Sequence, residues 1–212
     1  MSTRFLLIRH AAVDTGNPPR LCGTYDVPLS SKGRAQLLAL HHTALADHAP
    51  DALYTSPLQR ATDTARACAA LWHLEPRIEP AFQEIHCGAF EGMPIEEIKR
   101  LHAAVWARNT AQNDDAFRWP RGESYAQFRG RILGGLGRLA LEHPGRTVAV
   151  VTHSGVIAQV LGTLRGRPAA VWELDRPDPL SATEVLWKAT EPIALVGFNR
   201  REGSRALPQP HG

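Results

Sequence analysis

Long apolar runs are absent from this sequence. The longest, residues 147–152 (TVAVVT), has the length of one β-strand, whereas a membrane span needs roughly 18–20 consecutive apolar residues. The N-terminal apolar run, residues 5–8, ends at Arg9-His10 and is too short for the core of a signal peptide. The sequence therefore predicts a cytoplasmic protein that makes no contact with a membrane.

Cysteine is also scarce. The three cysteines, Cys22, Cys68 and Cys87, are an odd number at unrelated spacings and do not form a disulfide framework. This usage is typical of a protein from a reducing compartment. A chain of 212 residues buries enough surface to hold a core without a disulfide or a structural metal.

Lysine supplies few of the 24 basic residues, namely Lys32, Lys99 and Lys188. The formal net charge is only +3, and no basic run is longer than Arg200-Arg201. Nucleic-acid binding normally leaves a basic stripe with interleaved aromatic residues, so no nucleic-acid partner is expected. The dominance of arginine suits fork-shaped contacts to phosphate or carboxylate and is compatible with an anionic substrate.

Apolar stretches of strand length alternate with stretches of helical spacing. Strands are predicted at residues 5–8, 52–55, 147–152, 184–188 and 193–198, and helices at 32–46, 56–71, 94–107, 124–142 and 154–164. This alternation predicts an α/β fold, a three-layer sandwich with a mostly parallel central sheet and helices on both faces. Residues 1–200 are expected to form a single catalytic domain and residues 201–212 a disordered tail. The sequence leaves open whether the protein forms a homo-oligomer.

Helix starts and one polar stretch carry more local predictions. Capping boxes are predicted at Ser56 to Gln59 and at Ser124 to Gln127, and Ser30 or Ser31 is expected to cap the helix that follows. Residues 108–122 show no helical or strand period. We expect them to form a loop that influences substrate choice through Arg118 or Trp119.

Chemically active side chains follow three predicted strands. Arg9-His10 ends the first strand, Arg60 lies in the first turns of the helix after the second, and His153-Ser154-Gly155 follows the strand at 147–152. Ligands of parallel sheets bind at the carboxyl ends of the strands. Two arginines and a helix N-terminus can cradle a tetrahedral dianion, and a histidine in that cradle can attack phosphorus.

Each of these residues also has an ordinary structural explanation. A single histidine after a strand is usually structural, an arginine early in a helix is usually solvated, and Glu84 could be a salt-bridge partner. Their joint placement at three strand ends favours a functional site.

Six ordered motifs cover about residues 4 to 165 and resemble the histidine phosphatase (phosphoglycerate mutase-like) superfamily. They are Ile8-Arg9-His10-Ala11, Gly23 to Ser30 (GTYDVPLS), Ser56 to Ala61 with Thr64-Ala65, Glu84 to Gly88 with Phe90-Glu91-Gly92, Gly122-Glu123-Ser124, and Val151 to Gly155. The loop at 23–30 is similar to that of the α-ribazole phosphatase branch.

The resemblance implies roles for named residues. His10 would be the nucleophile, and Glu84 would protonate the leaving alkoxide and then accept a proton from water. The phosphoryl oxygens would be held by Arg9, Arg60 and His153, with further substrate contacts from Cys22, Gly23 and Ser154. No metal and no cofactor is implied, because arginines neutralise the phosphate charge.

The chain departs from the family pattern in its first loop. Ala11 replaces the usual glycine, Ala12 an acidic residue, Gly16 an asparagine that touches the phosphate, and Cys22 a small hydroxyl residue. A glycine-to-alanine change is tolerable at position 11 if the backbone φ there is negative.

The combined prediction is a metal-independent phosphatase that hydrolyses a small phosphomonoester, a phosphorylated metabolite, through phosphohistidine. One alternative is a phosphoglycerate mutase-type transfer. The mutase first loop usually carries a Trp-Asn pair where this chain has Thr15-Gly16, which favours the phosphatase. The other is a non-catalytic phosphate-binding regulatory module, supported only by Ala11 and Ala12.

Overall fold

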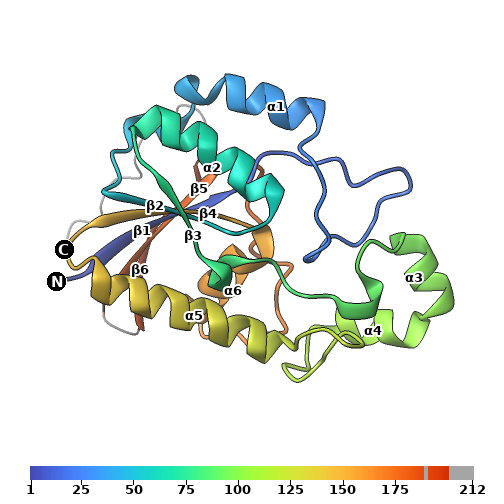
Figure 1. The fold of residues 1–212 in the computed structure, drawn as a ribbon. Coiled ribbons are helices and arrows are strands. Elements are labelled where there is room, and N and C mark those ends of the chain that lie inside the picture. Colours follow the sequence, from blue (N-terminus) through green and yellow to red (C-terminus); the bar gives the residue numbers. More distant parts are fainter. Residues whose placement is uncertain (189–190, 201–212) are drawn as a thin grey trace.

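A central β-sheet organises the molecule (Figure 1). The computed structural model describes residues 1–188 and 191–200, so the predicted disordered tail at 201–212 lies outside the described residues. In this part of the chain the strands are β1 (Thr3–Arg9), β2 (Ala52–Thr55), β3 (Pro76–Ile78), β4 (Thr147–Thr152), β5 (Ala182–Lys188) and β6 (Glu191–Arg200), in the order β3-β2-β4-β1-β5-β6. The first four are parallel, and β5 and β6 are antiparallel to their neighbours.

Helices cover both faces of the sheet, which confirms the predicted three-layer α/β fold. Helices α1 (Ser31–Leu38) and α2 (Gln59–Trp72) lie on one face, and α5 (Tyr125–Glu142) and α6 (Ser154–Leu164) lie on the other (Figure 1). Strand β1 shows why, because Phe5 and Leu7 pack among residues of α5 and α6, whereas Leu6 and Ile8 pack among residues of α2. Alternate side chains of a strand point to opposite faces, so both faces of β1 are apolar.

The carboxyl ends of the parallel strands lie level with one another. Arg9 pairs with Thr152, and Thr55 pairs with Val151. The residues that follow continue the backbone pairing, since His10 N–H donates to the Thr152 carbonyl (2.9 Å) and Ser56 N–H to the Val151 carbonyl (3.0 Å). This register brings residues distant in sequence to one edge of the sheet.

Two predicted helices are interrupted in the structure. The first, predicted at 32–46, ends at Leu38 and is followed by 3₁₀ turns at Leu40–His42 and Ala44–Asp47. The Thr43 hydroxyl caps the second of these turns, because it accepts from Leu45 N–H, and it donates to the Leu40 carbonyl. Ser30 is the N-cap of α1, as predicted.

The helix predicted at 94–107 is two helices, α3 (Ile95–Leu101) and α4 (Ala103–Ala111), separated at His102. Because α4 reaches Ala111, the start of the stretch 108–122 is helical rather than irregular. The short edge strand β3 was not predicted, since its three residues include proline and arginine and show no apolar run.

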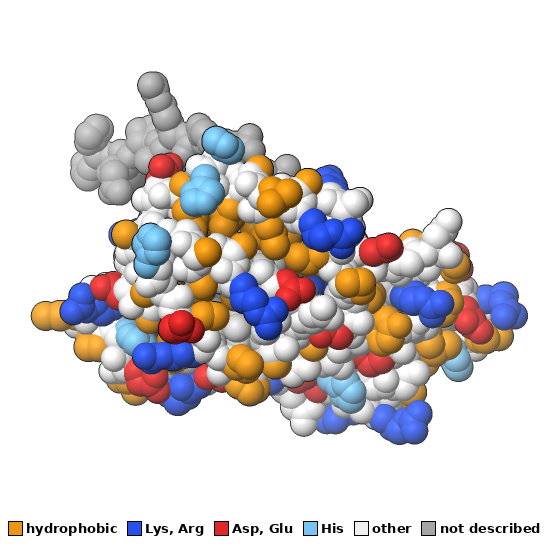
Figure 2. All heavy atoms as spheres, turned by 45° about the horizontal axis from the view of Figure 1, so that its top comes forward, with side chains coloured by type: hydrophobic (Ala, Val, Ile, Leu, Met, Phe, Trp, Pro, Cys, Tyr) orange, Lys and Arg blue, Asp and Glu red, His pale blue; other side chains and the backbone are white. Residues whose placement is uncertain are grey.

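Charges of both signs are mixed on the surface. On the face shown in Figure 2, Lys and Arg side chains are scattered among Asp and Glu and form no continuous basic stripe. No helix among the described residues has the length and apolar character needed to cross a membrane.

Candidate active site

A cavity of about 350 Å³ opens at the carboxyl edge of the parallel strands. Its size fits a small-molecule site. It brings together most of the site residues predicted from the sequence, and these are Arg9, His10, Cys22, Gly23, Arg60, Glu84 and Ser154. His153 is fully buried beside this group and does not line the cavity.

His10 is held as a neutral ring with one nitrogen available. Its Nδ1 lies 2.7 Å from the Ala11 carbonyl oxygen, which can only accept, so Nδ1 carries the proton and Nε2 keeps its lone pair. Burial, followed by the positive charge of Arg60, lowers the pKa of His10 to about 3. The ring is therefore neutral at physiological pH, the state in which Nε2 can attack an electrophile.

Alanine at position 11 fits the site. Its φ is not in the positive region, and its methyl group is fully buried in the apolar cluster on the α2 face of the sheet. Its N–H donates to Thr64 Oγ1 (3.1 Å). The condition for tolerating this departure from the family pattern is therefore met.

Two arginines give the cavity its positive charge. Arg60 is 2% exposed, and its guanidinium donates to the carbonyl oxygens of Gly23 (2.6 Å) and Tyr25 (3.1 Å). The partly exposed Asp26 carboxylate lies 3.3 Å from it. Arg9 donates to the Pro177 carbonyl (2.6 Å), and its buried Nε has no partner among the described residues. The Glu84 and Asp178 carboxylates offset part of the charge of Arg9. Two arginines at one cavity nevertheless favour an anionic ligand.

The ring of His153 packs against the ring of His10. The two rings are 5.2 Å apart at an angle of 61°. His153 Nε2 lies 2.7 Å from Ser56 Oγ, and its buried Nδ1 has no partner among the described residues. Burial and then the charge of Arg60 hold the pKa of His153 well below its usual value.

Ser56 is therefore not the helix cap predicted from the sequence. Helix α2 begins at Gln59, and its N-cap Leu58 makes no side-chain cap. The Ser56 hydroxyl accepts from Leu58 N–H (3.3 Å) and contacts His153 instead. A fully buried hydroxyl is most stable with a buried polar partner, which the sequence pattern did not reveal. The capping box at Ser124 and Gln127, by contrast, is confirmed.

Glu84 lines the same cavity as His10 and lies on the loop that precedes α3. One carboxylate oxygen accepts from Gly155 N–H at the start of α6 (3.0 Å) and the other from Ile85 N–H (3.0 Å). A Cβ atom on Gly155 would lie 2.2 Å from the Glu84 carboxylate, so only glycine permits this approach. The site thus holds a neutral histidine, two arginines and a carboxylate.

Comparisons with known proteins agree with this geometry. The family model for the histidine phosphatase superfamily (branch 1) matches residues 5–199. The chain belongs to the histidine phosphatase superfamily.

Several proteins similar to this histidine phosphatase carry the names of phosphatases. It is 29% identical over 159 residues (74% of this chain, 67% of the relative) to a metal-independent phosphoserine phosphatase of Arabidopsis thaliana. It is 30% identical over 151 residues, 71% of each chain, to phosphoserine phosphatase 1 of Hydrogenobacter thermophilus. The structure of a mycobacterial glucosyl-3-phosphoglycerate phosphatase matches with a TM-score of 0.80 at 26% identity, over 94% of this chain and 100% of that one. The protein is a phosphatase.

The first loop of this histidine phosphatase is held by Glu91. The Glu91 carboxylate accepts from Thr24 N–H (2.8 Å), the Thr24 hydroxyl (2.9 Å), Tyr25 N–H (2.6 Å) and Cys87 N–H (2.7 Å). Gly23 packs so tightly that a Cβ there would lie 2.2 Å from the Ile85 carbonyl. Glu91 therefore joins the first loop to the Glu84 loop and does not line the cavity.

The Cys22 thiol donates to the Arg20 carbonyl (3.3 Å), and burial raises its pKa. This keeps Cys22 a neutral thiol at the cavity wall. In the part of the chain that the structure describes, no group of three or more His, Cys, Asp or Glu residues is placed to hold a metal ion.

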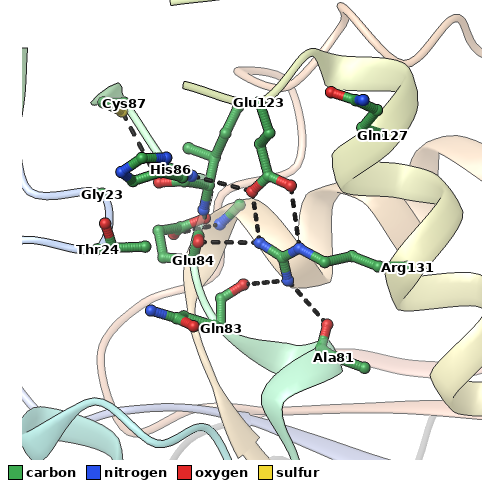
Figure 3. A network of polar contacts seen from close by, with 12 residues as sticks. Gly23, Thr24, Ala81, Gln83, Glu84, His86, Cys87, Glu123, Gln127 and Arg131 are labelled. Atoms are coloured by element: carbon green, nitrogen blue, oxygen red, sulfur yellow. Dashed lines mark hydrogen bonds and ion pairs between the residues drawn. The ribbon is translucent and has the colours of Figure 1, made fainter. Parts of the chain in front are cut away.

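An arginine on α5 fixes the loop that carries Glu84 (Figure 3). The Arg131 guanidinium donates to the carbonyl oxygens of Ala81 (2.9 Å), Gln83 (2.7 Å) and Glu84 (3.0 Å), and to both oxygens of Glu123 (2.6 and 3.0 Å). Glu123 in turn accepts from His86 N–H (2.9 Å). The sequence motif that contains Glu123 did not predict a role for Arg131, which lies eight residues later, on α5.

Replacing Arg131 with lysine should loosen this loop. Lysine keeps the charge but cannot reach three carbonyls and a carboxylate at once, so we expect the free energy of unfolding to fall by about 1.5–3 kcal/mol. Chemical denaturation measures this. The matched control is Arg138→Lys, two turns along α5, whose surface ion pairs with Glu79 and Glu142 are each expected to contribute about 0–1 kcal/mol. An equal, small loss in both variants would contradict the structural role of Arg131.

Some residues of the stretch 108–122, which was predicted to influence substrate choice, line the cavity. Trp119 lines the cavity and is 2% exposed, and Asn109 on α4 lines it too. Arg118 does not line it, because its guanidinium donates to the Gly122 carbonyl (3.0 Å) and closes a turn. Only part of the stretch is therefore placed to contact a substrate.

Proposed function

We propose that this phosphatase hydrolyses small phosphomonoesters through a phosphohistidine on His10. The observation that carries the proposal is the state of His10, which is neutral, held at Nδ1 by the Ala11 carbonyl and open at Nε2 between Arg9 and Arg60. Such a ring has its lone pair directed at the place where buried cations would hold a phosphate.

In the first step Nε2 of His10 attacks phosphorus and the ester P–O bond breaks. The guanidinium groups of Arg9 and Arg60 offset the charge on the phosphoryl oxygens, which is where phosphoryl transfer gains most of its catalysis. Glu84 gives its proton to the departing alkoxide. In the second step Glu84 takes a proton from water, the oxygen attacks phosphorus, and the P–N bond breaks to release phosphate and neutral His10.

The remaining site residues are assigned contacts to the substrate. Cys22, Gly23 and Ser154 line the cavity, and we assign them further contacts to the substrate. His153 is assigned a contact to a phosphoryl oxygen through Nδ1, which is buried and has no hydrogen-bond partner among the described residues.

Hydrolysis is favoured over transfer to a second hydroxyl. The position of the mutase Trp-Asn pair holds Thr15-Gly16, and Thr15 lines the cavity without filling it. The relatives named above are phosphatases, which act on phosphoserine or glucosyl-3-phosphoglycerate according to their names. Release of inorganic phosphate from a panel of phosphorylated metabolites, with analysis for transferred isomers, tests the proposal.

Turnover should survive chelation of metals. Because Arg9 and Arg60 supply the positive charge, and Glu84 the proton transfer, that a metal ion would otherwise provide, dialysis against EDTA is expected to leave phosphate release within about twofold of its starting rate. The measurement is p-nitrophenyl phosphate hydrolysis before and after dialysis. Loss of activity that Mg²⁺ or Zn²⁺ restores would overturn the mechanism.

We also place the enzyme in the cytoplasm, in keeping with its three free cysteines.

A further inference from the structure

The loop between α6 and β5, residues 165–181, forms part of the cavity wall although it contains no helix or strand. Side chains of the neighbouring helices hold its backbone instead. Arg129 on α5 donates to the carbonyl oxygens of residues 167 and 168 (2.6 and 3.0 Å), and Gln159 on α6 donates to that of Ala169 (2.7 Å). The first part of the loop is therefore fixed to two helices.

Gln112 fixes the next part of the loop from the end of α4. Its side-chain oxygen accepts from the N–H groups of Trp172 (3.0 Å) and Glu173 (3.1 Å), and its side-chain nitrogen donates to the Glu173 carboxylate (3.2 Å). Backbone N–H groups in a loop have no strand or helix partner, so they need such contacts. One side chain thus ties α4 to a loop that lies 60 residues further along the chain.

The backbone at Gln112 lies in the left-handed region, with φ 51° and ψ 35°. Residues with a side chain adopt this conformation rarely, because their Cβ atom is crowded there, whereas glycine adopts it freely. Glycine is also the usual residue at such a helix end. A glutamine at this position carries a backbone cost, which its three contacts to the loop offset.

Trp172 is the residue that these contacts place in the cavity wall. Its side chain is half-buried and lines the cavity together with Trp106 and Trp119. It packs against the apolar cluster that includes Trp119 and Tyr125. An indole ring offers a large flat apolar surface, which suits contact with the carbon part of a ligand. Gln112 holds the backbone of this same residue, so it acts directly on the position of the ring.

We propose that Gln112 is a positioning residue for substrate binding, which holds Trp172 where its ring contacts the organic part of the phosphate ester. This deepens the proposed phosphatase function and rests on it. A contact to the organic part is the same in the bound substrate and in the transition state, so it acts on KM rather than on kcat. Loss of the Gln112 side chain lowers the fraction of molecules whose loop is ready to bind.

The variant Gln112→Gly removes the side chain and keeps the left-handed backbone without strain. With 2-naphthyl phosphate, whose leaving group is large and flat, we expect KM to rise by about 5- to 20-fold, the factor that two hydrogen bonds of ordinary net strength supply. The kcat should stay within about twofold, and so should the inhibition constant of inorganic phosphate, which has no organic part. The matched control is His73→Gly, an exposed residue with the same left-handed backbone at the end of α2 and outside the cavity, which should change none of these values.

A double-mutant cycle tests whether Gln112 acts through Trp172. Trp172→Ala should raise KM for 2-naphthyl phosphate at least as much as Gln112→Gly does, and the double variant should differ from Trp172→Ala by less than about twofold. Additive effects would overturn the route through Trp172. An unchanged KM in Gln112→Gly would overturn the proposal, and so would an equal rise in KM and in the inhibition constant of inorganic phosphate, because the change would then act at the phosphate.

Hydrogen exchange separates this proposal from the phosphatase function. The amide hydrogens of Trp172 and Glu173 should exchange at least about tenfold faster in Gln112→Gly than in the wild type, whereas that of Ala170, which donates to Asp115 (2.7 Å), should not change. If the wild-type protein hydrolyses no phosphate ester, the phosphatase function fails, and these amides still report on the loop. Equal exchange in the variant and the wild type would overturn the positioning role independently of catalysis.

Discussion

Turnover should fall by roughly 10⁴- to 10⁶-fold when His10 is replaced by alanine, because the group that forms the bond to phosphorus is lost. Rapid quenching of the wild-type reaction should trap phosphate on His10 in a bond that is stable to base and labile to acid. The phosphorylation burst should persist at pH 5, where an ordinary histidine is mostly protonated, because the pKa of His10 is lowered to about 3.

The control for this experiment is His41→Ala, an exposed histidine of a 3₁₀ turn, which should retain full activity. An acid-stable label on a serine would refute the phosphohistidine route. So would a His10→Ala variant that keeps a tenth of the activity.

Changing Glu84 to glutamine should separate substrates by their leaving groups. An alkyl phosphate needs a proton on its departing oxygen, whereas p-nitrophenolate is a good leaving group without one. We expect phosphorylation of His10 by an alkyl phosphate to slow by roughly 10²- to 10⁴-fold, and phosphorylation by p-nitrophenyl phosphate to slow far less. Glutamine keeps an oxygen that can accept from Gly155 N–H, so the geometry of the loop should survive.

Pre-steady-state bursts with both substrates give the measurement. Glu91→Gln is the matched comparison, because Glu91 receives four hydrogen bonds that hold the first loop and lies outside the cavity. It should slow both substrates by similar factors. If Glu84→Gln also slows both alike, Glu84 is not the acid.

Much of the site was predictable because its residues follow strands. Apolar runs identified β1 and β4, and the parallel arrangement places the ends of such strands at one edge, so Arg9-His10 and His153 had to meet. Arg60 and Glu84 were expected at the same site from their motifs, and the structure brings both to the cavity. The expected roles of these residues remain to be tested by the variants above.

The partners of buried polar groups were not predictable. Ser56 fits a capping box by its spacing, yet it contacts His153, 97 residues away in the chain. Arg131 reaches the Glu84 carbonyl across 47 residues, and Arg176 reaches the cavity from a loop that carries no motif. The break at His102 and the antiparallel return of β5 were also hidden.

The division has a physical cause. Strand and helix periods depend on which face of an element is apolar, and that is written in neighbouring residues. The hydrogen-bonding partner of a buried serine and the proton position on His10 depend on atoms that only packing brings within 3 Å. The sequence alone therefore determined the sandwich and the residues gathered at its strand ends. The tertiary structure decided which nitrogen of His10 is open and what holds Glu84.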